Sequence, residues 1–106
     1  MRYYIAGPMS GCKDFNYPAF HAAAAAIRSA GHECVNPAEM HPDTTGRWED
    51  YMRADIAALM TCEAVAWLPD YWKSAGARLE IYIASSLHMP VHEAARIAPL
   101  DGGKTP

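Results

Sequence analysis

Ala64-Val65-Ala66-Trp67-Leu68-Pro69, followed by Ser74-Ala75-Gly76-Ala77-Arg78-Leu79-Glu80, is the stretch of this chain that decides its fold. The first run has no polar alternation, which is typical of a central strand covered on both faces. The second run opens a predicted helix over residues 75–87, where Leu79, Ile83 and Leu87 recur at helical spacing. A buried strand followed by a helix predicts a βαβ unit.

The same alternation continues on both sides of this stretch. Strands are predicted over residues 3–6 and 32–35, residues 89–91 are predicted to lead into a last short strand, and helices are predicted over residues 18–30 and 48–60. Asn16 is expected to cap the first helix and Gly31 to end it. Residues 37–46, with two prolines, are predicted to be a surface loop. The core stripe of the second helix is predicted to be Trp48, Met52, Ile56 and Leu59 or Met60.

These elements predict an α/β fold, a single-domain Rossmann-like (flavodoxin-like) three-layer sandwich with a small parallel sheet of four to five strands. The domain is expected over residues 1–100, and residues 101–106 are expected to be a flexible C-terminal tail. Three strand exits, at Gly7, Asn36 and Pro69, would then open on one edge of the sheet. Ligands of open α/β sheets bind at that edge.

Composition narrows the class of protein. The chain has 106 residues, of which 51% are hydrophobic and 20% charged, with a net charge of −3. This balance argues against binding of duplex nucleic acid. Three cysteines without a C-x-x-C pair fit a reducing compartment. No signal peptide or membrane-spanning run is recognised, so a cytoplasmic location without membrane association is expected.

Glu80 is the main functional clue, because it shares a helix face with Ile83 and Ala84, where a charge is unusual. Ser74 and Gly76 stand at the mouth of the same helix and offer a hydroxyl and backbone N–H groups to an anion.

A second candidate is the loop Gly7-Pro8-Met9-Ser10-Gly11 after the first strand, which either holds a ligand or only makes the turn. Neither G-x-G-x-x-G nor G-x-x-x-x-G-K-[ST] nor G-x-S-x-G occurs. His88 and His92 flank Pro90, so a zinc site on a helix is not expected, and no cofactor is predicted.

Three further features leave alternatives open. Asp55 lies at the edge of its helix stripe, either at the site or paired with Arg53, Arg78 or a backbone N–H. His41 either touches a substrate or is solvated in its loop. Tyr71 and Trp72 either wall a pocket for a base or sugar or contact a second subunit.

Together, Tyr4-Ile5-Ala6-Gly7-Pro8-Met9-Ser10-Gly11, the Asp55 helix and residues 74–80 resemble the nucleoside 2-deoxyribosyltransferase superfamily. The pattern is most similar to its short branch, DUF4406, from Tyr3 to about Val91. The resemblance implies cleavage of an N-glycosidic bond, with Glu80 as nucleophile and Asp55 protonating or orienting the departing base. It also implies that Tyr4 and Gly7 line the base and sugar.

Ser74, six positions before the predicted nucleophile Glu80, indicates the class of substrate. Transferases that act on free nucleosides usually have aspartate there, whereas Ser74 resembles the branch of nucleoside 5′-monophosphate N-glycosidases, in which the serine binds the phosphate. Ser10 and Gly11 would be further phosphate contacts. Hydrolysis of a nucleotide is therefore the leading hypothesis. The alternatives are base exchange, a non-catalytic nucleotide binder and a structural module. A homo-oligomer is expected, with Trp48, Tyr71 and Trp72 as candidate contacts.

Overall fold

The computed structural model describes residues 1–41 and 46–99, and in these the predicted alternation of strands and helices is present. The strands are β1 (Arg2–Ala6), β2 (Glu33–Val35), β3 (Ala64–Trp67) and β4 (Val91–Glu93). The helices are α1 (Tyr17–Ser29), α2 (Pro37–Met40), α3 (Trp48–Leu59) and α4 (Ala75–Ser86). Short 3-10 helices are η1 (Lys13–Asn16), η2 (Tyr71–Lys73) and η3 (Ala94–Arg96).

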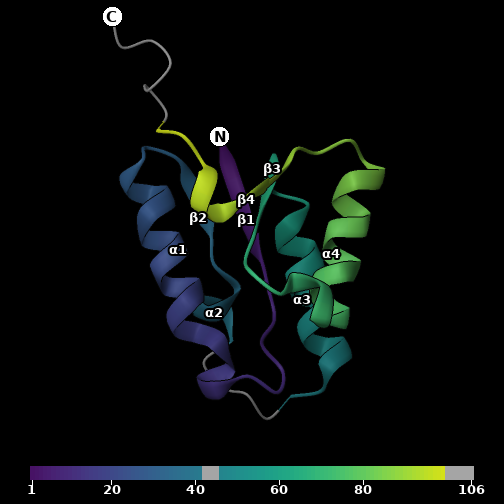
Figure 1. Cartoon of the computed structure of the whole chain (residues 1–106). Coiled ribbons are helices and arrows are strands. Elements are labelled where there is room, and N and C mark those ends of the chain that lie inside the picture. Colours follow the sequence, from purple (N-terminus) through teal and green to yellow (C-terminus); the bar gives the residue numbers. More distant parts are fainter. Residues whose placement is uncertain (42–45, 100–106) are drawn as a thin grey trace, which may run out of the picture.

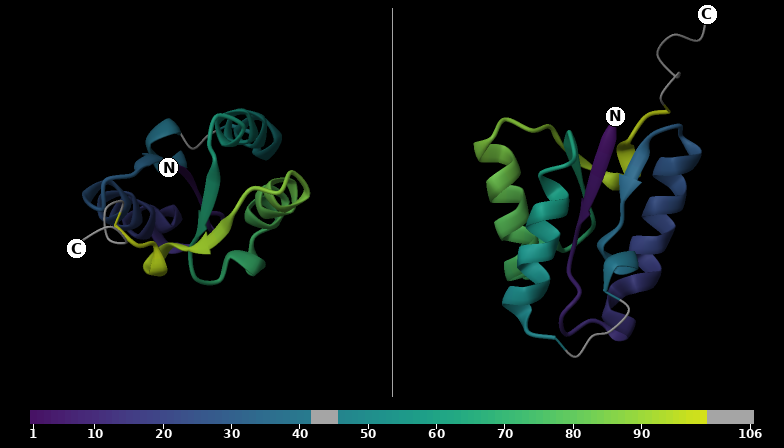
Figure 2. Two further views of the ribbon diagram at one scale, coloured as in Figure 1. Left: turned by 90° about the horizontal axis from the view of Figure 1, so that it is seen from above. Right: turned by 180° about the vertical axis from the view of Figure 1, so that it is seen from behind.

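The four described strands form one parallel sheet in the order β2-β1-β3-β4. Helix α1 covers one face of the sheet, and α3 and α4 cover the other, as both views of Figure 2 show. The predicted three-layer α/β sandwich with a four-stranded parallel sheet is therefore confirmed. The carboxyl ends of the strands point to the lower end of the molecule in Figure 1.

Alternate residues of β1 pack into the two halves of the core, one on each face of the sheet. Tyr3 and Ile5 pack with Phe20, on α1, whereas Tyr4 and Ala6 pack with Leu59, on α3. All six side chains are buried. Because successive side chains of a strand point to opposite faces, a central strand needs apolar residues throughout, as the sequence of β1 predicts.

Both core stripes differ from the prediction. On α4 the buried residues are Gly76, Ala77, Glu80 and Ala84, while Leu87 is exposed. Of the predicted stripe, Ile83 packs against the core, Leu79 is half-buried and Leu87 was wrong; the fully buried positions are mostly small residues, which let the helix lie close to the sheet. On α3, Met52 and Leu59 are buried as predicted, Asp55 is also buried, and Trp48 and Met60 are exposed.

Two local predictions before the third strand were also wrong. Asn16 has a left-handed backbone (φ 60°) and makes no side-chain cap to α1. The predicted loop over residues 37–46 begins with the short helix α2, which Asn36 caps by accepting a hydrogen bond from the Ala38 N–H at 3.0 Å. An Asn-Pro pair is a helix start of the usual kind, since proline at the first position needs no N–H partner.

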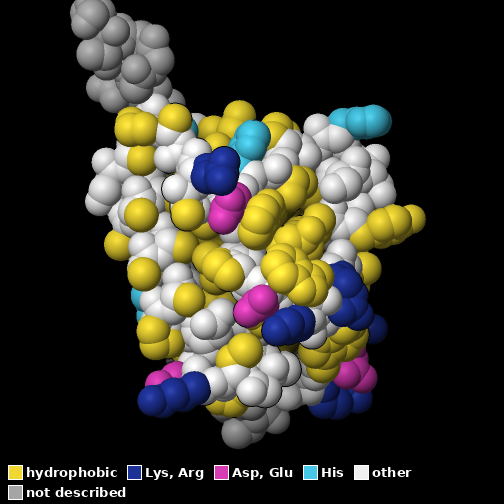
Figure 3. Space-filling view, in the orientation of Figure 1, with side chains coloured by type: hydrophobic (Ala, Val, Ile, Leu, Met, Phe, Trp, Pro, Cys, Tyr) yellow, Lys and Arg dark blue, Asp and Glu magenta, His cyan; other side chains and the backbone are white. Residues whose placement is uncertain are grey.

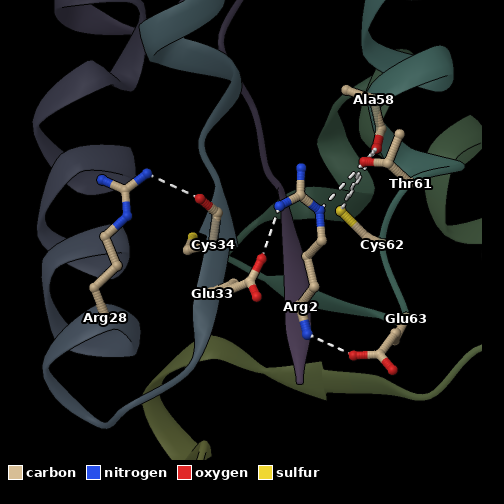
Figure 4. Close-up of polar contacts among 8 residues, drawn as sticks. All are labelled: Arg2, Arg28, Glu33, Cys34, Ala58, Thr61, Cys62 and Glu63. Atoms are coloured by element: carbon tan, nitrogen blue, oxygen red, sulfur yellow. Dashed lines mark hydrogen bonds and ion pairs between the residues drawn. The ribbon is translucent and has the colours of Figure 1, made fainter.

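At the amino end of the sheet, Arg2 ties three segments together (Figure 4). Its guanidinium donates to Glu33 on β2 at 2.9 Å and to the Thr61 hydroxyl at 3.4 Å, and its backbone N–H donates to Glu63 at 2.9 Å. These contacts fix the amino ends of the strands at the edge away from the strand exits.

The surface seen in Figure 3 has a band of hydrophobic side chains between α1 and α4. Among the described residues, no helix is long and apolar enough to cross a membrane. The three cysteines are free. The predicted tail, residues 101–106, lies outside the described residues.

Candidate active site

The strand exits surround a cavity of about 100 Å³. The loop after β1, the segment after β2, α3 and the start of α4 all contribute to its wall. Of the predicted site residues, those that line it are Tyr4, Gly7, Met9, Ser10, Asp55, Ser74, Gly76 and Glu80. Pro8 and Gly11 do not: Pro8 is buried beside the cavity, and Gly11 is an exposed turn residue with φ 80°.

Glu80 is 5% exposed and lies on the face of α4 that packs against the sheet. The Tyr4 hydroxyl donates a hydrogen bond of 2.6 Å to Glu80 Oε2. Burial raises the pKa of Glu80 to about 8, which the hydrogen bond from Tyr4 opposes and the nearby Asp55 reinforces. The carboxyl therefore faces a cavity in a poorly hydrated setting.

Tyr4 is suited to hold this carboxyl. Its side chain is fully buried, and its pKa lies well above the usual value because of burial first and the charge of Glu80 second. The phenol therefore keeps its proton and acts as a fixed donor to Glu80. The position of Tyr4 in the middle of the central strand β1 fixes where the oxygen of Glu80 lies.

Asp55 is buried on α3, and His41 lies beside it. The distance from His41 Nε2 to Asp55 Oδ1 is 2.6 Å, and the His41 side chain is 12% exposed. Burial raises the pKa of Asp55, although the bond with His41 lowers it. The partner is therefore neither of the two arginines proposed from the sequence; Arg78 donates to the Trp72 carbonyl at 2.8 Å.

His41 is also not the solvated loop residue that was the commoner alternative, since it is half-buried and lines the cavity. Its ring lies against the ring of Tyr51, with centroids 4.7 Å apart and the two planes inclined by 55°. Sequence reasoning missed Tyr51 and the other aromatic lining residues, which are Phe15, Tyr17, Phe20 and Trp48. Tyr71 and Trp72 pack on each other outside the cavity, so they do not form its wall.

Ser74 and Gly76 stand where α4 begins. The Ser74 hydroxyl accepts a hydrogen bond of 3.1 Å from the Ala77 N–H and so caps the helix. A Cβ at Gly76 would lie 3.0 Å from Met52 Sδ and 3.6 Å from Trp48 Nε1. The glycine thus allows α3 and α4 to approach closely at the mouth of the cavity.

Among the described residues, no group of three or more His, Cys, Asp or Glu is arranged to hold a metal ion. Two buried carboxyls in different environments, one held by a phenol and one by an imidazole, can divide the roles of nucleophile and proton donor.

The comparisons with known proteins agree with this fold. The model of a family described as a domain of unknown function, DUF4406, matches residues 1–93. Among solved structures, the chain is similar to a 2-deoxyribosyltransferase from the psychrotolerant bacterium Bacillus psychrosaccharolyticus, with a TM-score of 0.68 and 20% identity. The match covers 86% of this chain and 69% of the other. At that identity the likeness is one of fold. A comparison with curated protein sequences gives no match.

Proposed function

The chain belongs to the DUF4406 family, and we propose that it cleaves the N-glycosidic bond of a (deoxy)nucleoside 5′-monophosphate or a related nucleotide, releasing the free base. The observation that carries the proposal is the buried Glu80 carboxyl, held by Tyr4 at 2.6 Å and facing a cavity that also contains Asp55. A fold shared with a nucleoside-processing enzyme supports a glycosyl reaction at this site.

In the proposed mechanism, the ionised Glu80 attacks the anomeric carbon as the bond to the base breaks. Positive charge develops on the sugar in the transition state, and a buried carboxylate beside it stabilises that charge strongly. The Tyr4 hydroxyl holds one oxygen of Glu80, so the other is free to face the sugar. The product of this step is a glycosyl ester of Glu80.

The departing base requires a proton when it is neutral. Asp55, whose pKa burial raises, is the proposed donor, and His41 orients it and can return the proton to it. Water then attacks the ester, and Asp55 accepts the proton of that water as general base. The sugar leaves with the hydroxyl group of the water.

The phosphate is proposed to lie at the start of α4. Ser74 and Gly76 line the cavity there, and the first amides of a helix have no partner within it. Ser10, in the loop after β1, faces the same cavity. These groups support a substrate with a 5′-phosphate.

The decisive experiment is Glu80→Gln, which keeps the size of the side chain and an acceptor for the Tyr4 hydroxyl. Release of base from nucleoside monophosphates should fall by roughly a thousandfold or more, while the nucleotide is still bound. Glu49→Gln, on the exposed first turn of α3, is the matched control and should keep full activity. Unchanged turnover in Glu80→Gln would contradict the proposal.

Two alternatives are separated by the same assays. A base-exchanging transferase would form a new nucleotide when a second base is supplied, whereas a hydrolase would release sugar phosphate. A non-catalytic nucleotide binder would bind nucleotides without releasing base, in the wild type as well as in Glu80→Gln.

We also propose that the protein is a cytoplasmic homo-oligomer. Trp48 and Trp72 are both about half exposed, and large exposed aromatic side chains are enriched at protein interfaces. Light scattering of the purified protein tests this, since a monomer at micromolar concentration would contradict it.

A further inference from the structure

The segment between β1 and α1, at the lower end of the molecule in Figure 1, has an unusual backbone. Asp14, Phe15 and Asn16 have φ angles of 52°, 53° and 60°, so three successive residues with side chains lie in the left-handed region. Residues other than glycine adopt this region singly, because it places Cβ too close to the following carbonyl oxygen. Each of the three therefore adds strain, which contacts elsewhere in the chain must offset.

Few contacts hold this strained segment. The 3-10 helix η1 contains no buried residue, and the side chain of Asn16 does not cap α1. The Phe15 N–H donates a hydrogen bond of 3.1 Å to the Cys12 carbonyl. On the amino-terminal side, Gly11 has a φ of 80° and nothing within 4 Å of a Cβ built on it, so the chain is free to rotate there. A strained segment with few contacts opens at low cost.

Phe15 connects this segment with the candidate active site. It is 43% exposed and lines the cavity together with Glu80 and Asp55, so it stands at the mouth. The cavity of about 100 Å³ is small beside the roughly 300–1,000 Å³ of most ligand pockets, and it cannot enclose a nucleotide unless part of its wall moves. Building on the proposed function, we propose that residues 11–16 are a gate, in which Phe15 closes the mouth and moves aside to admit the nucleotide.

The rest of the wall has less freedom to move. Tyr4 and Glu80 are buried on β1 and α4. The Tyr17 hydroxyl fixes the start of α1 by donating a hydrogen bond of 2.9 Å to the His41 carbonyl. Among the described lining residues, Phe15 is the one with a left-handed backbone. The movement is therefore confined to the segment that precedes α1.

Two opposed effects set the balance between the closed and open forms of the gate. Opening releases the strain of the left-handed residues. Closure keeps the contact between the rings of Phe15 and Tyr17, whose centroids are 6.0 Å apart, and keeps Phe15 against the cavity. A change in the strain alone must therefore shift this equilibrium, and with it the rates at which a ligand enters and leaves.

The test compares two double variants that remove the same side chains. Asp14→Gly with Asn16→Gly relieves the strain of the closed form, whereas Asp14→Ala with Asn16→Ala increases it. The probe is the nucleoside monophosphate that the wild type cleaves fastest among the common ribo- and deoxyribonucleotides. Its binding is followed by stopped-flow tryptophan fluorescence in the Glu80→Gln background, which does not turn it over. The association and dissociation rate constants should both be lower in the glycine pair and both higher in the alanine pair, at least about tenfold apart, while the dissociation constant changes little.

A second measurement needs no ligand. The Phe15 amide exchanges with solvent when its hydrogen bond to Cys12 opens, so its protection factor, measured by NMR, should be higher in the glycine pair than in the alanine pair. Asp70→Gly and Asp70→Ala are the matched controls. Asp70 is also exposed and left-handed, with a φ of 67°, but it does not line the cavity. Neither control should change the binding rates or the protection of Phe15.

The outcomes separate the gate from the proposed function. Equal rate constants and equal protection in the two pairs would overturn the gate and leave the proposed function standing. A change in the dissociation rate constant alone would do the same, because it indicates a simple contact with the ligand. If no nucleoside monophosphate were cleaved or bound, the proposed function would fail instead. The exchange of the Phe15 amide would then still show whether the segment opens, and equal protection in the two pairs would overturn the gate as well.

Discussion

At the scale of single residues, Glu80 combines two opposed requirements. Burial favours its protonated form and raises its pKa to about 8, while attack on a sugar requires the ionised form. Tyr4 reduces the conflict, because its hydrogen bond stabilises the carboxylate. The enzyme proposed above therefore has a nucleophile that becomes more available as the pH rises toward 8, where half of it is ionised.

The first prediction is a pH profile and its shift in Tyr4→Phe. In the wild type, the rising limb of kcat/KM, which reports ionisation of Glu80, should have its midpoint at about pH 8, and the need for a protonated Asp55 should make the profile fall again at higher pH. Removal of the phenol removes a donor to the ionised form, so the midpoint should move up by about one unit and kcat/KM at pH 7 should fall roughly tenfold. Tyr3→Phe, on the opposite face of β1, is the control and should leave the midpoint in place. An unshifted midpoint in Tyr4→Phe would show that Glu80 does not control the profile.

The second prediction concerns stability and pH. The pKa of Glu80 is about 8 in the folded chain against an ordinary value of 4.5, so between these pH values the folded state holds more protons than the unfolded state. Stability must then fall as the pH rises through this window. Relative to the wild type, Glu80→Gln should gain up to about 4 kcal/mol in unfolding free energy between pH 5 and pH 8. Urea unfolding at the two pH values measures it.

A constant difference between the two proteins at all pH values would refute this prediction, because a glutamine does not titrate. Asp50→Asn is a suitable control, since Asp50 is on the exposed first turn of α3 and makes a surface ion pair with Arg47. Surface pairs of this kind contribute little to stability.

At the scale of elements, the end of β1 depends on a glycine. A Cβ at Gly7 would lie 2.8 Å from Leu68 Cδ1 and 2.9 Å from Leu68 Cβ. Both residues are buried, so the strand and the segment after β3 would have to separate.

The third prediction is that Gly7→Ala lowers the unfolding free energy by about 1–3 kcal/mol, the usual cost of overpacking. It should also weaken nucleotide binding, because Gly7 lines the cavity. Gly11→Asn is the control: nothing lies within 4 Å of a Cβ there, and asparagine tolerates its φ of 80°. Chemical unfolding should show a much smaller loss for Gly11→Asn, and equal losses would rule out the close approach to Leu68 as the cause.

The elements also show which parts of the fold could be predicted from the sequence. The apolar run of β3 and the alternation of strands with helices predicted the layers and the parallel sheet, because a strand buried on both faces has a distinct composition. The buried face of α4 was predicted only in part, through Glu80, Ile83 and Ala84. Spacing alone offered Leu79, Ile83 and Leu87, but close approach of the helix to the sheet favours Gly76, Ala77 and Ala84. Only tertiary packing decides between two such faces.

The partner of Asp55 illustrates the limit for the site. Arg53 is two residues from it in sequence and exposed, whereas His41 comes from another element and is bonded to it. The sequence placed the two carboxyls and the strand exits, which follow from local patterns. Contacts between segments that are 14 residues or more apart, such as His41 with Asp55 and Tyr4 with Glu80, follow from the topology of the sheet and have no local signal.

At the scale of the whole molecule, the cavity is lined by residues from all three layers. Phe20 comes from α1, Tyr4 from the sheet, and Met52 and Ala77 from the helices on the other face. Unfolding of any layer would therefore open the site. A ligand that binds only the closed site must stabilise the entire domain by mass action.

The last prediction uses this coupling. A nucleoside monophosphate at a hundred times its dissociation constant should stabilise the fold by about 2.7 kcal/mol, and for a domain of this size the melting temperature should rise by about 10 °C or more.

Ser74→Ala should lower the melting temperature without ligand, because the cap of α4 is lost at a cost of about 1 kcal/mol. Its ligand-induced rise should also be smaller, since the phosphate loses a contact. The free base and inorganic phosphate, tested separately in a thermal-shift assay, should each give a much smaller rise. If no nucleotide raised the melting temperature of the wild type, the buried carboxyls would be structural, and the site would have no nucleotide ligand.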